Sequence, residues 1–131
     1  MNEGSRHQAR ERAFALLYEA EVKERPVSEV MLELLLPLEP YAQTLLDVVN
    51  KHEDEINKAL TEAATDWALD RMPAVDRNVL RVALAELLTQ DDVPVAVIIN
   101  EAVELAKEFS TEESGKFING VLSTLAEKVR S

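Results

Sequence analysis

The chain has 131 residues, a net charge of −11 and no cysteine. This length suits one domain with a buried core. The absence of cysteine excludes a disulfide framework and a thiolate zinc site. No apolar run approaches the length of a membrane span, and no signal-peptide pattern opens the chain, which predicts a cytoplasmic protein. Three glycines and few aromatic residues favour helices over strands.

The chain begins with a basic segment. Residues 5–12 carry three arginines and one glutamate on an otherwise acidic chain. Ser5 and Gln8 match a capping box, which predicts a helix that begins near Arg6. These arginines are either ordinary solvated charges or a cationic surface for a ligand. The helical wheel places Arg10 and His7 on the side that carries Phe14 and Tyr18, away from a stripe of small residues, with Arg6 near the core boundary. We expect a neighbouring helix to cover Phe14 and an external partner to contact Tyr18.

Helical spacing of apolar residues continues through the middle of the chain. Residues 28–36 predict a short helix, which ends at two prolines. Residues 41–63 fit one long helix or two helices with a break at 50–53, and the acidic residues there favour two. Residues 66–72 predict a short helical turn whose Trp67 closes one end of a bundle.

Two broad apolar patterns follow. After Pro73, residues 74–88 predict a helix with a wide apolar face. Residues 93–109 are apolar around so much of their circumference that we expect this helix to be central, with Phe109 in its buried stripe. A capping-box pattern at 110–113 predicts a last helix directly afterwards. The predicted fold is all-α, a single compact bundle of about seven helices that forms one domain over residues 1–131.

The sequence lacks the motifs of catalysis. It has no glycine-rich phosphate loop, no nucleophile elbow and no zincin motif. His52 has no second histidine near it and is interpreted as a boundary or core residue. The sequence therefore predicts no enzyme, no cofactor and no metal.

Three segments resemble the NusB family of bacterial transcription antitermination factors, in its actinobacterial form. The string NEAVELAKEFSTEESGKFINGVL at 100–122 is similar to the family signature. The string RMPAVDRNVLRVALAEL at 71–87 is similar to the preceding helix, and residues 6–18 resemble the basic first helix. The three segments follow the family's order and span nearly the whole chain.

The resemblance implies a factor that binds the boxA element of ribosomal and phage leader transcripts together with NusE, the tenth protein of the small ribosomal subunit. Their complex keeps RNA polymerase elongating, notably on ribosomal RNA operons. In the family, the first helix and the start of the last helix contact RNA. The matching RNA-binding positions are Arg6, Arg10, Glu113, Lys116 and Phe117, and the matching NusE-facing positions are Tyr18 and Asp76.

Physical chemistry favours several of the same residues. Single-stranded RNA is bound by cations on its phosphates and by aromatic rings against its bases. We therefore expect Arg6 and Arg10 to face phosphates and Phe117 to be exposed beside its helix's apolar stripe. Asp76 stands near the start of its helix, where we expect it to be exposed. The alternative is a protein-binding helical scaffold, or a homodimer that hides the basic helix, without direct RNA contact.

Overall fold

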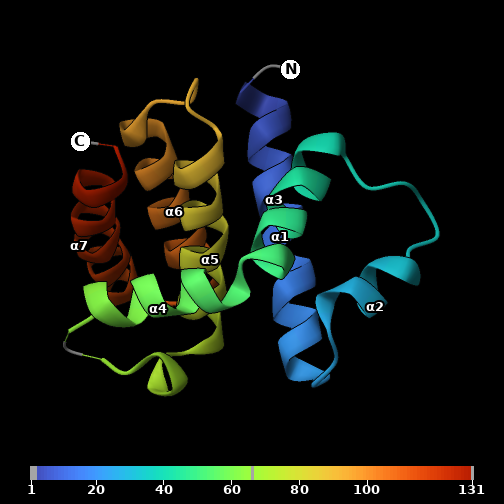
Figure 1. Ribbon diagram of the computed structural model, residues 1–131, viewed down its shortest axis with the longest axis horizontal. Coiled ribbons are helices and arrows are strands. Elements are labelled where there is room, and N and C mark those ends of the chain that lie inside the picture. Colours follow the sequence, from blue (N-terminus) through green and yellow to red (C-terminus); the bar gives the residue numbers. More distant parts are fainter. Residues whose placement is uncertain (1–2, 66, 131) are drawn as a thin grey trace.

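The computed structural model describes residues 3–65 and 67–130. In these residues seven α-helices and one 3-10 helix form a bundle without strands, which confirms the predicted all-α fold (Figure 1). The elements, in chain order, are α1 (Glu3–Val22), α2 (Val27–Leu32), α3 (Pro40–Lys51), α4 (Glu53–Ala63), η1 (Leu69–Arg71), α5 (Ala74–Thr89), α6 (Val95–Phe109) and α7 (Glu112–Val129).

The breaks between helices follow local sequence. The chain leaves the helical conformation at His52, so α3 and α4 are separate helices, as preferred from the sequence. Helix α7 begins after Thr111, whose hydroxyl accepts a hydrogen bond from the Ser114 N–H at 3.1 Å. This bond satisfies one of the free N–H groups of the first turn. The cap therefore lies one residue later than Ser110, where the capping-box pattern begins.

Three boundaries differ from the sequence prediction. Helix α1 already includes Ser5, so the predicted start near Arg6 is wrong. Helix α2 ends at Leu32, and the next residues form a loop that leaves Leu35 and Leu36 exposed. The predicted turn over 66–72 is the shorter η1, and position 66 lies outside the described residues.

Helix α5 is the centre of the bundle. From Asp76 to Leu87 all its residues except two arginines are buried, and it packs against α1, α3, α4, α6 and α7. Helix α6 packs mainly against α5 and α7, and Phe109 at its end is 44% exposed. The predictions that α6 is central and that Phe109 is buried are therefore wrong. Neighbouring helices cover the apolar circumference of α6 only partly. The half-buried residues on it are Val95, Val97, Ile99 and Val103.

Candidate nucleic-acid and partner interface

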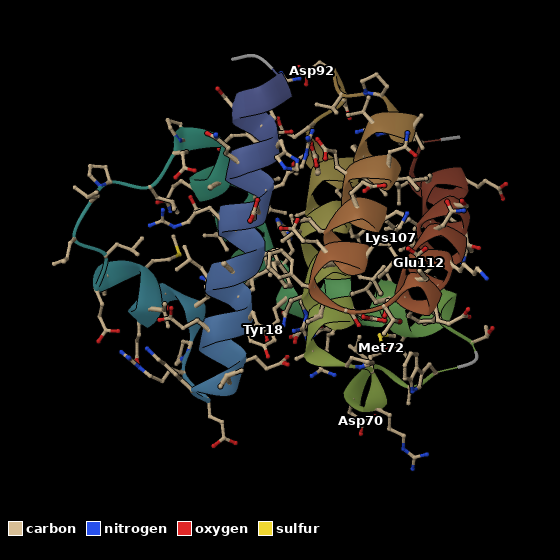
Figure 2. All side chains as sticks on the ribbon, turned by 180° about the vertical axis from the view of Figure 1, so that it is seen from behind. Tyr18, Asp70, Met72, Asp92, Lys107 and Glu112 are labelled. Atoms are coloured by element: carbon tan, nitrogen blue, oxygen red, sulfur yellow. The ribbon has the colours of Figure 1, made fainter. Side chains whose placement is uncertain are left out.

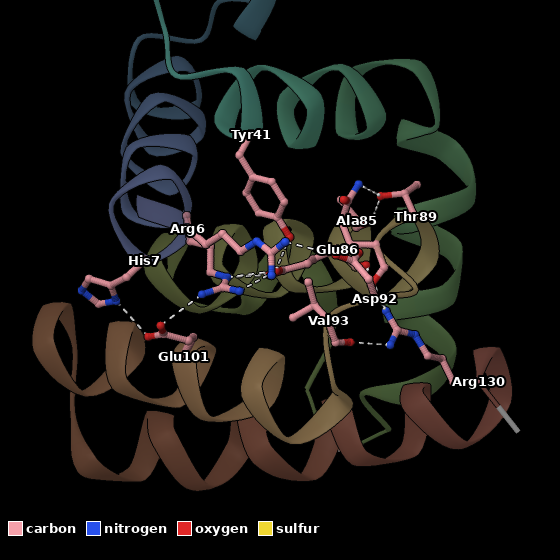
Figure 3. A network of polar contacts seen from close by, with 12 residues as sticks. Arg6, His7, Tyr41, Ala85, Glu86, Thr89, Asp92, Val93, Glu101 and Arg130 are labelled. Atoms are coloured by element: carbon pink, nitrogen blue, oxygen red, sulfur yellow. Dashed lines mark hydrogen bonds and ion pairs between the residues drawn. The ribbon is translucent and has the colours of Figure 1, made fainter. Parts of the chain in front are cut away.

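Arg10 lies at the centre of a buried ionic network rather than on the surface. Its guanidinium donates to both carboxylate oxygens of Glu86, with a shortest distance of 2.7 Å, and to Glu101 at 3.1 Å. The Tyr41 hydroxyl donates to the same Glu86 carboxylate at 2.6 Å (Figure 3). Arg10 is 2% exposed and Glu86 is 1% exposed. The expectation that Arg10 faces phosphates is wrong for this arrangement, because Glu86 and Glu101 bind its guanidinium inside the bundle.

Burial and the hydrogen bond to Glu86 also affect the pKa of the Tyr41 hydroxyl. Removing the Tyr41 proton would place a second negative charge beside Glu86 in a site with little water. Burial and the bond to Glu86 therefore raise the pKa of the Tyr41 hydroxyl. The hydroxyl remains a donor, and the network joins α1, α3, α5 and α6.

Arg6 and His7 lie at the outer edge of this network. The Arg6 guanidinium donates to Asp92 at 3.1 Å and stacks over the Tyr41 ring at 5.5 Å. His7 Nδ1 lies 2.8 Å from Glu101, and this hydrogen bond raises the pKa of the imidazole. Both side chains keep some exposure, 22% for Arg6 and 43% for His7. Phosphates can reach this edge, but carboxylates already contact both groups.

The end of α7, rather than its start, lies close to the start of α1. Arg130 donates to the backbone carbonyls of Leu87, Gln90 and Val93 at 2.7–2.9 Å. The Leu87 carbonyl belongs to the last turn of α5. The Gln90 and Val93 carbonyls belong to the turn between α5 and α6, which also carries Asp92, the partner of Arg6. Figure 1 shows α7 running from the opposite end of the bundle towards this turn.

The predicted RNA-binding residues are consequently split between two regions. Lys116 and Phe117 lie in the first turns of α7, about 20 Å from Arg130 along the helix axis. Figure 2 shows the same separation, with Asp92 beside the start of α1 and Glu112 towards the other end. The structure does not bring Arg6 together with Lys116 and Phe117, so a ligand that contacts all three must be extended.

Phe117 is half-buried and has an aromatic neighbour. Its ring packs edge-to-face against Trp67, with the ring centroids 5.3 Å apart. Trp67 is 37% exposed. Lys116 next to it is strongly exposed, and its ammonium lies 3.4 Å from the Glu113 carboxylate. Phe117 is thus partly in the core and partly at the surface, and it is less exposed than we expect from the sequence.

The two glycines of this helix differ in their surroundings. A side chain at Gly115 would begin 2.9 Å from the aliphatic part of Lys107, so glycine permits α6 and α7 to approach closely there. A Cβ at Gly120 would meet no atom within 4 Å. Gly120 is therefore not a helix-contact glycine in this structure.

Tyr18 and Asp76 lie in the same part of the molecule, where α5 begins beside the end of α1. Arg77 donates to both Glu21 oxygens at 2.6 and 2.8 Å, and this pairing lowers the pKa of Glu21. Tyr18, one turn before Glu21, is 39% exposed, which matches the expectation that a partner can reach it.

Asp76 is fully buried, with 0% exposure. The expectation that it is exposed near its helix start is therefore wrong, because the α6–α7 corner with Ser114 covers this side of α5. Among the described residues neither carboxylate oxygen has a hydrogen-bond partner. Burial raises the pKa of this carboxyl; the Ser114 hydroxyl and the Asp76 backbone N–H are near enough to lower it, but not in hydrogen-bond geometry, and their effects are smaller.

The predictions from the sequence missed or misplaced three residues of these regions. Glu86 stands within the apolar run VALAELL, and a lone carboxylate there is a signal of a buried ion pair. Trp67 was assigned to closing the bundle, without its contact to Phe117. No residue pattern distinguishes the exposed Phe109 from its buried neighbours on α6. Within the described residues no group of three or more metal-ligating side chains could hold a metal ion, and no helix could span a membrane.

The chain resembles known proteins over nearly its whole length. The NusB family model matches residues 7–127. The transcription antitermination protein NusB of Thermobifida fusca (strain YX) is 50% identical over 129 residues, which covers 95% of this chain and 91% of the relative. The T. maritima NusB structure has a TM-score of 0.87 at 32% identity and covers 96% of this chain and 93% of that one.

A further structural relative was solved as a complex. The crystal structure of antitermination factors NusB and NusE in complex with dsRNA matches with a TM-score of 0.81 at 28% identity, and it covers 97% of this chain and 99% of that chain. The fold therefore agrees with solved members along its full length. The family match and the relative that is 50% identical show that the chain belongs to the NusB family.

Proposed function

We propose that this chain is a non-catalytic transcription antitermination factor of the cytoplasm. It binds boxA-type single-stranded RNA together with NusE and keeps RNA polymerase elongating, notably on ribosomal RNA operons. The observation that carries the proposal is the match, over nearly the whole chain, to a relative solved with NusE and dsRNA. Phe117 and Lys116 at one end of the bundle and Arg6 at the other supply an aromatic ring and two cations that suit a single strand.

The RNA contacts in this proposal are fewer than the sequence predicts. Arg10 is a structural residue here, and the remaining contacts are Arg6, Lys116 and Phe117, with Glu113 beside them. Asp92 forms an ion pair with Arg6, and Glu113 forms one with Lys116. A phosphate must replace a carboxylate at both places, so the isolated protein binds RNA weakly.

The ion pairs of Arg6 with Asp92 and of Lys116 with Glu113 favour a second candidate function. A protein-binding scaffold, or a homodimer that covers α1, needs no free cations on this face. The two candidates differ in one measurable property, which is direct RNA binding by the purified chain.

RNA binding is tested by titrating a boxA-like single strand over a range of salt concentrations, with and without NusE. About two to four phosphate contacts give a log–log salt slope of about −1.5 to −3, at about 0.7 per contact. We expect NusE to strengthen binding, and unlabelled duplex DNA to compete poorly. A slope near zero, or equal affinity for duplex DNA, would reject the proposed RNA-binding function, and no binding of RNA by the purified chain would favour the scaffold.

A pair of neighbouring aspartates sharpens this experiment. Asp92→Asn removes the carboxylate that forms an ion pair with Arg6, whereas Asp91→Asn removes the same charge from an exposed residue that forms no ion pair within the described part of the chain. We expect Asp92→Asn to tighten RNA binding about twofold to fivefold beyond Asp91→Asn, the effect of one surface ion pair. Equal effects of both variants would show that Asp92 does not compete with RNA for Arg6.

The role of Phe117 is tested with two substitutions. Phe117→Ala should weaken RNA binding by about 1–3 kcal/mol, because the base loses its aromatic contact. It should also destabilise the fold, because the ring packs on Trp67 and on the core. Phe117→Leu keeps most of the apolar packing but has no aromatic face. It should therefore retain stability and still lose RNA affinity.

The chain contains one tryptophan, so the emission of Trp67 reports on this end of the bundle. A base that stacks on Phe117 should alter that emission during the titration. If Phe117→Leu binds RNA as tightly as the wild type, Phe117 is a core residue and does not stack on a base.

A further inference from the structure

A cavity of about 240 Å³ lies between several segments of the bundle. The end of α1, the start of α2, the joint between α3 and α4 and the first half of α5 surround it (Figure 1). None of the residues proposed to contact RNA lines this cavity, and neither do Tyr18 and Asp76. At about 30 Å³ for each water molecule the cavity holds about eight waters, so it suits a ligand of roughly that many non-hydrogen atoms.

The guanidinium of Arg81 supplies a cation to the cavity. Its Nε donates to Asn57 at 3.1 Å, and its Nη1 donates to Asn78 at 3.0 Å and to Glu21 at 3.2 Å. Within the described residues its Nη2 has no acceptor and is not buried. Both Glu21 oxygens already accept from Arg77, at 2.6 and 2.8 Å, so two guanidinium groups share one carboxylate. The Arg81 charge is therefore only partly balanced and can bind a further carboxylate.

Glu53 supplies an anion to the same cavity. It is the first residue of α4, it is exposed, and its carboxylate forms no hydrogen bond or ion pair within the described part of the chain. Burial lowers the pKa of Arg81, and the Glu53 charge acts against this effect, so the two groups lie near each other without contact. The exposed Asn50, in the last turn of α3, also lines the cavity. Glu53 and Asn50 can therefore accept hydrogen bonds from an ammonium group.

Much of the remaining lining is apolar. Arg25 also lines the cavity, but Glu29 and Glu33 accept the hydrogen bonds of its guanidinium. The buried apolar residues of the lining are Leu17, Ala20, Val27 and Val49. Small-molecule sites typically combine such an apolar surface with a few polar groups that fix the orientation of the ligand.

We propose that this cavity binds a free amino acid with a branched apolar side chain, such as leucine. The ligand's carboxylate accepts from Arg81, its ammonium group donates to Glu53, and its side chain packs against the apolar lining. A cation, an anion and an apolar surface in one small cavity match the three parts of this ligand. Charge-assisted hydrogen bonds at both ends offset the cost of removing its charges from water. The inference goes beyond the proposed function and does not depend on it.

The first test is titration calorimetry of the full chain with leucine and with three analogues. Isocaproate lacks the ammonium group, isoamylamine lacks the carboxylate, and glycine lacks the apolar side chain. Each should bind at least about tenfold more weakly than leucine, because each loses one of the three contacts. Leucine at about ten times its Kd should raise the melting temperature by about 3–6 °C. Glycine at the same concentration controls for the general stabilising effect of a small zwitterion.

The second test uses a pair of neighbouring carboxylates. Glu53→Gln removes the proposed ammonium partner, whereas Asp54→Asn removes the same charge from the next exposed residue, which does not line the cavity. Both variants remove one negative charge from the first turn of α4, so without ligand they should melt at the same temperature. Glu53→Gln should bind leucine about tenfold more weakly than Asp54→Asn does.

Three results would overturn the proposal. Leucine that does not bind the wild type would remove the site, and equal leucine affinities of Glu53→Gln and Asp54→Asn would place the ligand elsewhere. Isocaproate that binds as tightly as leucine would show that the cavity takes a simple anion instead of a zwitterion. None of these results bears on RNA or NusE binding, which involves other residues.

Discussion

Replacing Arg10 with methionine should destabilise the fold by about 3–5 kcal/mol, the cost of removing one partner from a buried ion pair. Glu86 would lose its ionic partner in a site that is 1% exposed, and among the described residues the Tyr41 hydroxyl would be the side chain that still donates to it. Equilibrium unfolding in urea, followed by circular dichroism, measures the loss. Arg12→Met is the matched control, because Arg12 lies on the same helix but is partly exposed. It should change stability by less than about 1 kcal/mol.

The companion variants Glu86→Leu and Arg10→Met/Glu86→Leu complete a double-mutant cycle. Each single substitution leaves one buried side chain without its main ionic partner, although Arg10 still donates to Glu101, whereas the double substitution removes both charges. The double variant should therefore be more stable than either single variant. Should Arg10→Met unfold at the wild-type urea concentration and lose only RNA affinity, Arg10 would be a phosphate ligand after all.

The helices were predictable from the sequence because each depends on nearby residues. The break between α3 and α4 follows from the acidic turn after His52, and the cap of α7 from the serine and threonine before it. Helical spacing also predicts a buried face on α7 made of Ile118, Val121, Leu122, Leu125 and Val129; the first four are buried, and Val129 is 37% exposed. It placed Phe117 beside that face, where the structure shows a half-buried ring.

The environment of each candidate site residue was less predictable, because it depends on helices far apart in the chain. Arg10 lies on the correct side of α1, yet its main partner Glu86 is 76 residues away. A helical wheel gives the direction of a side chain but not which helix packs there. For the same reason the sequence could not show that α7 runs so that its end, with Arg130, approaches the turn beside Arg6.

The resemblance implies that Asp76 faces the partner together with Tyr18, but the expectation that Asp76 is exposed is wrong. The position near a helix start usually leaves a carboxylate in solvent, where it interacts favourably with the helix dipole. In this structure the α6–α7 corner covers it, and its pKa is raised through burial. A direct contact of Asp76 with a partner therefore does not agree with this arrangement.

Asp76→Lys should destabilise the domain strongly, because it places an ammonium group in a fully buried site at a cost of several kcal/mol. Asp76→Asn should instead stabilise the protein at neutral pH, because the neutral amide has nearly the shape of the protonated acid and carries no charge. Thermal melts of the two variants beside the wild type measure the difference. Asp76→Lys with a wild-type melt and weak NusE binding would mean that the side chain is exposed and contacts the partner.

The stability difference between the wild type and Asp76→Asn depends on pH through the Asp76 carboxyl, because every other titrating group is present in both proteins. The Asp76 pKa is raised in the folded state above its unfolded value of about 3.9. Below the unfolded pKa the group is protonated in both states and costs no stability; as pH rises through the folded pKa, stability is lost. The wild type should therefore lose stability relative to Asp76→Asn as pH rises, by about 1.4 kcal/mol for each unit of pKa shift. A difference that stays constant from pH 4 to 8 would mean that Asp76 does not titrate in this range, and that its carboxylate has donors which hold it ionised.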